Sequence, residues 1–209
     1  MAEPLVPSPD PTAPSGGPDD DVAARLVASA RRLLLEDGLD QVTVRSVAIG
    51  AGVSTMNVYS RFGGKDGLLD VLLREGFETL GAELAAIREP DLANQIRAFV
   101  EAYRRFALDH PARYLLMFGG ETRGFKPSAE SVTVARGVLA DVARQFDAAA
   151  ARGELTLPDG ADSVQVAAVI WAFCHGTIVF ETGSVADELL DWSVVSAAGV
   201  DALIARYCR

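Results

Sequence analysis

Cysteine and aromatic residues are scarce in this chain of 209 residues. Cys174 and Cys208 are its two cysteines, too few for a disulfide framework, so we expect a protein of a reducing compartment, the cytoplasm. Aromatic residues make up 7% of the chain, whereas hydrophobic residues, many of them alanine, make up 49%. This composition is typical of soluble, mostly helical proteins, and the length allows one or two domains with a sizeable core.

The sequence also lacks the features of a membrane or secreted protein. It has no uncharged apolar run of 18 residues with suitable flanks, and no basic N-terminal segment followed by an apolar stretch. We therefore expect neither a membrane span nor a secretory signal.

Residues that would carry catalysis or bind a metal ion are rare. His110 and His175 are the two histidines, and neither Cys-x-x-Cys nor His-x-x-x-His spacing occurs. Cys174 precedes His175, but adjacent residues on a helix point about 100° apart and do not form a nucleophile–base pair. No glycine-rich phosphate loop follows a strand. We expect no enzyme, no metal and no cofactor, and we interpret His175 as a buried, hydrogen-bonded histidine.

One stretch, residues 41–65, contains no acidic residue although the whole chain carries a formal charge of −10. Arg45, Arg61 and Lys65 give the stretch a positive charge. Such a segment suits a surface that meets phosphate, because phosphate contacts supply most of the nonspecific affinity for nucleic acid. The alternative is a solvated helical hairpin that lacks acids by chance.

The same stretch has the pattern of a helix-turn-helix. Thr43 is suited to N-cap a short helix over residues 44–50, and Ser54 a second one over residues 55–61. Gly50 and Gly52 bracket the turn, where one of them supplies a positive φ. Val58 and Phe62 face inward, which leaves a polar face on the second helix.

This pattern resembles the N-terminal DNA-binding domain of the TetR-type family of bacterial transcriptional regulators. The resemblance covers LLLEDGLDQVTVRSVAIGAGVSTMNVYSRFGGKDGLLDVLL, with matches at Gly38, Thr43, Val44, Ala48, Ala51 to Ser54, Val58, Tyr59, Phe62, Lys65, Leu68 and Leu69. Members of the family often carry a small residue in place of Met56, and an aromatic residue or histidine in place of Ser60. The family's usual contacts are therefore not transferred to these two positions.

The resemblance implies double-stranded DNA, a palindromic operator, as the partner of this stretch. The candidates for base contacts are Arg45, Thr55, Met56 and Asn57. The candidates for phosphate contacts are Thr43, Ser54, Tyr59, Ser60, Arg61 and Lys65.

The rest of the chain predicts an all-α fold. Residues 1–18 hold six of the ten prolines and no arginine or lysine, and we interpret them as a disordered tail. Residues 19–65 form a three-helix DNA-binding domain, whose first helix ends at Gly38, and residues 66–88 form a linking helix. Residues 89–209 form a helical domain for ligand binding and dimerisation. The helices expected there span residues 92–108, 112–118, 128–152, 162–182 and 187–207.

Trp171, His175 and Gly176, with HPARYLLMF upstream, resemble a C-terminal regulatory domain that is named after its Trp-His-Gly (WHG) signature and occurs in a subset of the family. The last two helices are so apolar that we expect them to pair with their copies in a homodimer. The alternative is a monomer that buries both helices in its own core.

A cavity for a small lipophilic effector is expected among the aromatic residues of the second domain. Its candidate lining is Tyr103, Phe106, Tyr114, Met117, Phe118, Phe146, Trp171 and His175, although an aromatic residue at helical spacing more often belongs to an ordinary core. The resulting hypothesis is a dimeric repressor that releases its operator when the effector binds. The alternatives are an activator, and an all-helical enzyme or binding protein without DNA binding.

Overall fold

The computed structural model describes residues 18–119, 124–158, 160–183 and 190–209, and this part of the chain is almost entirely helical. Nine α-helices and one short 3-10 helix, Leu39–Gln41, follow one another along it. Its extended backbone pairs only in an isolated bridge between Leu155 and Cys208. The prediction of an all-α fold is therefore confirmed. Of the predicted tail, all but Pro18 lies outside the described residues.

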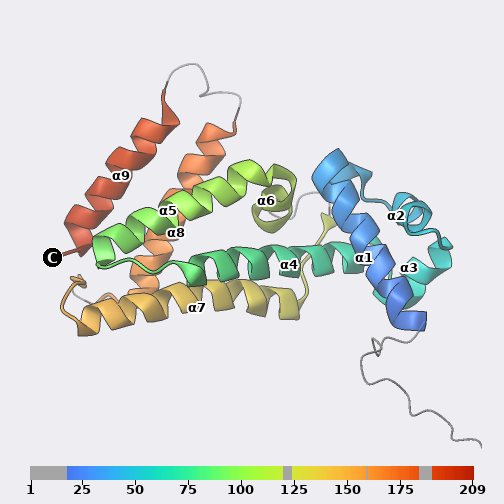
Figure 1. Ribbon diagram of the computed structural model, residues 1–209, viewed down its shortest axis with the longest axis horizontal. Helices are drawn as coiled ribbons and strands as arrows, with labels where there is room; N and C mark the ends of the chain where they lie inside the picture. Colours follow the sequence, from blue (N-terminus) through green and yellow to red (C-terminus); the bar gives the residue numbers. More distant parts are fainter. Residues whose placement is uncertain (1–17, 120–123, 159, 184–189) are drawn as a thin grey trace, which may run out of the picture.

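Three helices form the head at one end of the molecule: α1 (Pro18–Asp37), α2 (Val44–Ala51) and α3 (Thr55–Phe62) (Figure 1). α1 packs on both shorter helices, and its buried residues Leu26 and Leu34 share one core with Val47 and Val58. As predicted, Gly38 ends the first helix, and its φ of 87° is a conformation that side chains disfavour.

Two close backbone contacts fix the geometry of the head. A Cβ atom on Gly50 would lie 2.3 Å from Ser29 Oγ of α1, and a Cβ atom on Gly67 would lie 1.8 Å from the carbonyl oxygen of Phe62. Glycine is therefore required where α4 leaves α3, because the clash there is with backbone, whereas a larger residue at position 50 would displace the Ser29 hydroxyl where α2 crosses α1.

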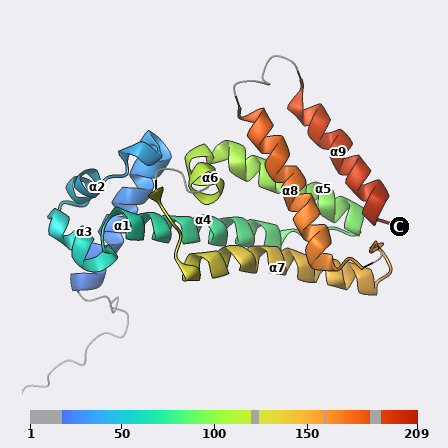
Figure 2. The same ribbon diagram turned by 180° about the vertical axis from the view of Figure 1, so that it is seen from behind.

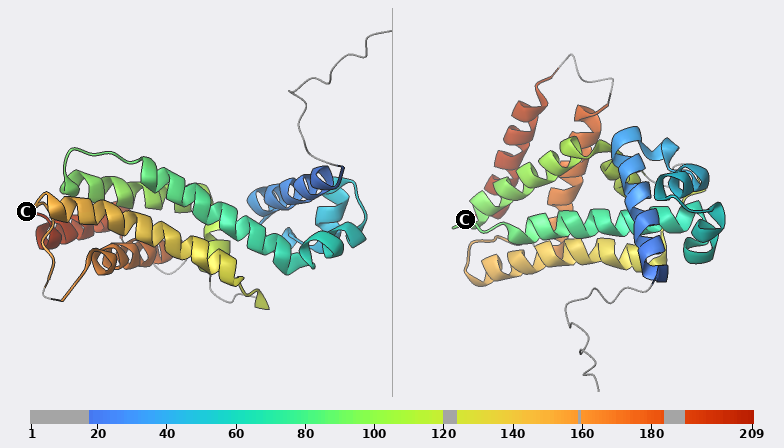
Figure 3. Two further views of the ribbon diagram at one scale, coloured as in Figure 1. Left: turned by 90° about the horizontal axis from the view of Figure 1, so that it is seen from below. Right: turned by 45° about the vertical axis from the view of Figure 1, so that its right-hand side comes forward.

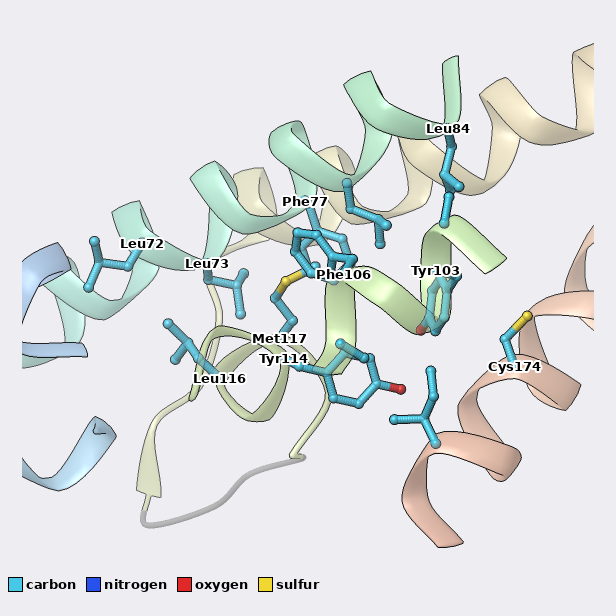
Figure 4. Packing of buried hydrophobic residues seen from close by; sticks show 14 of the residues in the cluster. Leu72, Leu73, Phe77, Leu84, Tyr103, Phe106, Tyr114, Leu116, Met117 and Cys174 are labelled. Atoms are coloured by element: carbon cyan, nitrogen blue, oxygen red, sulfur yellow. The ribbon is translucent and has the colours of Figure 1, made fainter. Parts of the chain in front are cut away.

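α4 (Lys65–Ala86) joins the head to the rest of the molecule, which we call the body (Figures 1 and 2). Its first turns pack on α1 and α3, and its later turns run along α7 (Ala129–Ala151). Leu72, Leu73, Phe77 and Leu84 follow one another along its buried side (Figure 4). The body is completed by α5 (Leu92–Asp109), α6 (Pro111–Phe118), α8 (Ser163–Glu181) and α9 (Trp192–Tyr207). The predicted start of the last helix at residue 187 lies outside the described residues, and the observed helix starts at Trp192.

Two polar networks tie the head end of α4 to its neighbours. Arg31 of α1 donates two hydrogen bonds to Glu75, at 2.9 and 2.7 Å. The carboxylate of Asp70 accepts from the backbone N–H of Ser128 at 2.9 Å and from the Ser128 hydroxyl at 2.7 Å. Partial burial of the carboxylate acts to raise the pKa of Asp70, but the hydrogen bonds from Ser128 and Ser131 and the positive charge of Arg74 together hold it below its ordinary value.

α8 crosses the body beside α5 and α7, and α9 stands next to it at the end away from the head (Figures 1 and 3). α8 and α9 approach closely, since a Cβ atom on Gly199 would lie 2.3 Å from the ring of Phe173. Their outer surfaces are apolar and exposed at Val164, Val169, Val179, Phe180 and Val194. Among the described helices, α8, at 19 residues, is the one that is long and apolar enough to cross a membrane, and 33% of its apolar window is buried in the protein. Because core helices of soluble proteins meet the same criterion, this property alone does not indicate a membrane span.

Candidate nucleic-acid interface and apolar cavities

The outward face of α3 is the most distinctive surface of the head. Met56 is 70% exposed and Tyr59 is 55% exposed, whereas Val58 on the opposite side is fully buried. Thr55 and Ser60 are exposed at the two edges of this face. At about 100° per residue, Met56 and Tyr59 stand at the centre of the face, between the two hydroxyl groups.

Ser54 occupies the N-cap position of α3, but its side chain does not cap the helix in the expected way. The Ser54 hydroxyl accepts a hydrogen bond from Asn57 Nδ2 at 3.1 Å, and no backbone N–H donates to it. The amide of Asn57 lies three residues along the helix and competes for the same oxygen. The prediction of a capping hydroxyl at Ser54 was therefore wrong.

Asn57 also holds Arg61 in place. Arg61 Nη1 donates to Asn57 Oδ1 at 2.8 Å, so that Ser54, Asn57 and Arg61 form one hydrogen-bonded row. The helical rotation places this row beside the outward face of α3 rather than at its centre. Both ends of the Asn57 amide are thus engaged within the protein.

α2 is capped as the sequence predicts. The backbone N–H of Ser46 donates to Thr43 Oγ1 at 3.1 Å, and the backbone N–H of Thr43 donates to Ser46 Oγ at 3.0 Å. These two bonds form a capping box, which satisfies two backbone donors that the helix leaves open. Gly52, with φ 66°, ends the helix in the left-handed conformation.

The ten predicted DNA-binding residues lie on α2, on α3 and at the adjoining helix ends, and each is exposed or half-exposed. α2 and α3 stand at the outer end of the head, away from the body (Figure 1). Lys65 is the first residue of α4 and follows α3 after only Gly63 and Gly64. The positive end of the α4 dipole and the Lys65 ammonium therefore lie together at this surface.

An inner cavity of about 40 Å³ lies in the body between α4, α5, α7 and α8. Its lining includes Leu84, Tyr103, Leu139, Trp171 and Cys174, and no charged side chain among the described residues contributes to it. Trp171 Nε1 donates to the Tyr103 hydroxyl at 2.8 Å, so the main polar groups of this wall satisfy each other. Burial raises the pKa of the Cys174 thiol to about 12, which excludes it as a nucleophile at neutral pH.

Aromatic rings continue from the inner cavity toward α6. The ring of Phe118 lies 4.8 Å from that of Tyr114, 5.9 Å from that of Trp171 and 5.4 Å from that of His175. The hydroxyl of Tyr114 is hydrogen-bonded to His175 Nδ1 at 2.6 Å. Desolvation lowers the pKa of His175, so the neutral form is favoured at neutral pH. His175 is hydrogen-bonded as expected, but it is half-buried rather than fully buried.

The predicted effector-binding residues fall into three groups. Tyr103 and Trp171 line the inner cavity, and Met117 lines a second cavity beside it. Tyr114, Phe118 and His175 form the adjoining aromatic cluster. Phe106 and Phe146 are core residues, buried to 98% or more and outside the lining of both cavities. The sequence reading missed the aliphatic part of the lining, such as Leu80 and Leu139, because aliphatic residues at helical spacing look the same in a core and in a cavity wall.

Comparison with known families gives two matches along the chain. Residues 26–72 match the model of the bacterial regulatory proteins of the tetR family. Residues 96–205 match the model of the tetracyclin repressor-like C-terminal domain. The two matches cover the head with the start of α4 and most of the body.

Among individual proteins, the chain is 27% identical over 143 residues to the HTH-type transcriptional regulator Rv1816 of Mycobacterium tuberculosis. The matched stretch is 66% of this chain and spans 61% of the length of that relative.

Solved structures with the same fold include a protein of unknown function from Rhodococcus sp. RHA1, with a TM-score of 0.74, 26% identity, and coverage of 90% of this chain and 95% of that one. A tetR-family regulatory protein from Rhodococcus RHA1 has a TM-score of 0.62 and 22% identity, covering 88% of this chain and 95% of its own. A TetR variant from Acinetobacter baumannii AYE, in complex with minocycline, has a TM-score of 0.62 and 21% identity, covering 87% and 93%.

Proposed function

Because the chain belongs to the tetR family of bacterial regulatory proteins, we propose that it is a transcriptional repressor in the cytoplasm. Members of this family are DNA-binding regulators rather than enzymes. In this proposal the protein binds a palindromic operator as a homodimer, and a small lipophilic effector releases it.

The observation that carries the proposal is the outward face of α3. This face is exposed, belongs to a stretch without carboxylates, and has cationic side chains at both ends of the helix-turn-helix. A short helix presented in this way fits the DNA major groove, where base edges and thymine methyl groups are accessible.

The structure refines the roles proposed for individual residues. Asn57 is engaged with Ser54 and Arg61, so we assign it mainly to orienting the guanidinium of Arg61. Met56 is the apolar group best placed for a thymine methyl group. Arg45 and Thr55 remain the other base candidates, and Thr43, Ser54, Tyr59, Ser60, Arg61 and Lys65 the phosphate candidates.

The proposed dimer uses the exposed faces of α8 and α9. Val169, Gly176 and Val179 recur on one side of α8, and Phe180 is 60% exposed at its end. A Cβ atom on Gly176 would meet no other atom within 4 Å in the single chain, so this side is open to another helix. Two copies related by a twofold axis would cover these faces in a four-helix interface and present two heads to half-sites about 34–36 Å apart or somewhat wider.

The effector site is proposed at the cavities beside α4. α4 lines the inner cavity through Leu80 and Leu84 and carries the head at its other end. An effector that favours one position of α4 therefore favours one separation of the two heads, and the operator fits only some separations. A structural neighbour is in complex with minocycline, which supports the proposal of a small-molecule site in this fold. Membership of the WHG subset stays a prediction.

Selection of bound DNA from a random pool tests the proposed function directly. We expect a palindromic sequence, because two identical heads read two half-sites. A variant with Arg61→Ala and Lys65→Ala should recover no sequence, whereas Arg88→Ala with Arg144→Ala, which removes the same charge far from the head, should recover the wild-type sequence. Recovery of no enriched sequence at low salt by the wild-type protein would contradict DNA binding. The position of the footprint relative to the promoter then separates repression from activation.

A further inference from the structure

A second cavity, which we call the outer cavity, lies beside the inner one and measures about 240 Å³. It is formed mainly by α4, α6 and α7, through residues that include Leu73, Phe77, Met117 and Arg136. Figure 4 shows Leu73, Phe77 and Met117 gathered at this place, with Leu84, Tyr103 and Cys174 of the inner cavity farther along α4.

The two cavities follow one another along a single line. They share Leu139 and Trp171 as the wall between them. Leu73 and Phe77 of α4 line the outer cavity, and Leu80 and Leu84, one and two turns later, line the inner one. The stretch of α4 from Leu73 to Leu84 rises about 16 Å, at about 1.5 Å per residue. The two cavities therefore follow about three turns of α4 with the Leu139–Trp171 wall between them, and the inner cavity, at about 40 Å³, is wide enough only for a slender apolar group.

Arg136 is the one charged residue that lines either cavity in the part of the chain that the structure describes. It is exposed, and its guanidinium makes no hydrogen bond or ion pair with the described residues. The positions one turn away on α7 are Val132, Thr133, Leu139 and Ala140, so the helix supplies no carboxylate for it. Arg144 on the same helix differs, because it is paired with Asp141.

We propose that the effector is a single-chain amphipathic carboxylate whose chain occupies the outer and inner cavities in succession and whose carboxylate pairs with Arg136. The inference rests on the proposed function, because it names the ligand class of the effector site. A guanidinium matches a carboxylate in planar geometry, and an unbranched chain is the apolar shape that fits a narrow space. Entry of the chain requires Leu139 to turn away from Trp171.

The position of the outer cavity also connects this ligand to the head. Ser131 lines the outer cavity, and its backbone N–H donates a hydrogen bond to Ser128 Oγ at 3.1 Å. Ser128 in turn donates to Asp70 at the head end of α4. A chain that separates α7 from α4 at this point therefore strains the network that holds α4 in its present position.

Titration calorimetry of the full chain at low ionic strength, without DNA, tests this ligand class. Decanoate and 1-decanol are the probes, because they share a chain and differ in charge, and butanoate tests the need for the chain. We expect decanoate to bind about three- to tenfold more tightly than 1-decanol, since the pair with Arg136 is solvent-exposed. Butanoate should show no measurable binding. Equal affinity for decanoate and 1-decanol, or tight binding of butanoate, would overturn the proposal.

Two variants and one control variant test where the probes bind. Arg136→Gln should lower decanoate affinity to that of 1-decanol while it leaves 1-decanol affinity within about twofold, because only the charged contact is lost. Arg144→Gln, the matched control on the same helix, should change neither affinity. Ala135→Phe should abolish binding of both probes, because the larger side chain fills the outer cavity. An equal loss for both probes in Arg136→Gln, or the same pattern in Arg144→Gln, would overturn the proposal.

The operator assay keeps this inference separate from the proposed function. Binding of decanoate with the expected pattern, by a protein that binds no operator, would support the ligand class and contradict the repressor. Binding of an operator that decanoate does not release, by a protein that also fails to bind decanoate, would support the regulator and overturn the ligand class.

Discussion

The protein leaves two surfaces open that differ in almost every respect. The outward face of α3 mixes Met56 and Tyr59 with hydroxyl groups and neighbouring cations, in a stretch without acids. The outer face of α8 carries valine, alanine and glycine, and the one charged residue of the helix, Glu181, pairs with Arg104 of α5 instead. The first surface suits a polyanion with apolar methyl groups, and the second suits another apolar surface. We propose DNA as the partner of the first surface and a second copy of the chain as the partner of the second.

The largest expected effect comes from a charge on the apolar face. Val169→Glu should convert the dimer to a monomer and weaken operator binding more than about 100-fold, because burial of an unpaired carboxylate in an interface costs several kcal/mol. Light scattering gives the mass, and a gel shift gives the affinity. Ala140→Glu places the same charge on an exposed position of α7 and should leave both unchanged. A Val169→Glu protein with the wild-type mass would show that α8 is not in the interface.

A smaller effect on dimerisation is expected from a substitution on the same face, and it tests whether the two α8 helices pack closely. Gly176→Ala should weaken dimerisation about tenfold, because the added methyl group separates two helices that pack closely. Gly137→Ala on α7 also adds a methyl group where no atom lies within 4 Å, and should instead stabilise its helix slightly. Sedimentation measures the dimer constant of both variants. A tighter or unchanged dimer in Gly176→Ala would place the partner helix elsewhere.

On the polar face, Lys65→Ala should weaken binding to operator and to random DNA about fivefold each. One phosphate contact per subunit, and so two per dimer, is lost on either DNA, so the slope of affinity against salt should fall by about two ions. Filter binding over a range of salt concentrations measures this slope. An unchanged slope on both DNAs would remove Lys65 from the phosphate contacts.

The smallest expected effect concerns recognition of the base sequence of the operator. Met56→Ala should weaken operator binding about threefold and leave random DNA unaffected, because only apolar contact with a base methyl group is lost. Replacement of operator thymine by uracil should produce the same loss in the wild-type protein and no further loss in the variant. Additive losses would show that Met56 and the methyl group do not touch.

The head could be predicted in more detail than the body, and the residues explain why. Thr43, Gly38 and Gly52 act through their own backbone geometry, which is local and therefore visible in the sequence. The hydroxyl of Ser54 was misjudged because two donors, a backbone N–H and the amide of Asn57, compete for it. The outcome of such a competition depends on side-chain rotamers that the sequence pattern does not specify.

In the body, the existence of each helix followed from its apolar spacing, but the cavities did not. Phe146 and Trp171 are both aromatic residues on amphipathic helices, yet one is a core residue and the other lines a cavity. The difference arises from how α4, α7 and α8 are spaced in three dimensions, which long-range packing determines. The ten DNA-binding residues and the effector residues remain predictions that the experiments above test.

The rate at which the buried thiol of Cys174 reacts measures how often the helices of the body separate. A group with a pKa of about 12, only 4% exposed, reacts with alkylating reagents chiefly during moments when the surrounding helices part. Cys208 is half-exposed near the C-terminus and supplies an internal reference within the same molecule. The ratio of the two labelling rates therefore reports how often the interior opens to solvent. A compound that binds beside Cys174 would lower the labelling rate of Cys174 relative to that of Cys208, without any DNA present.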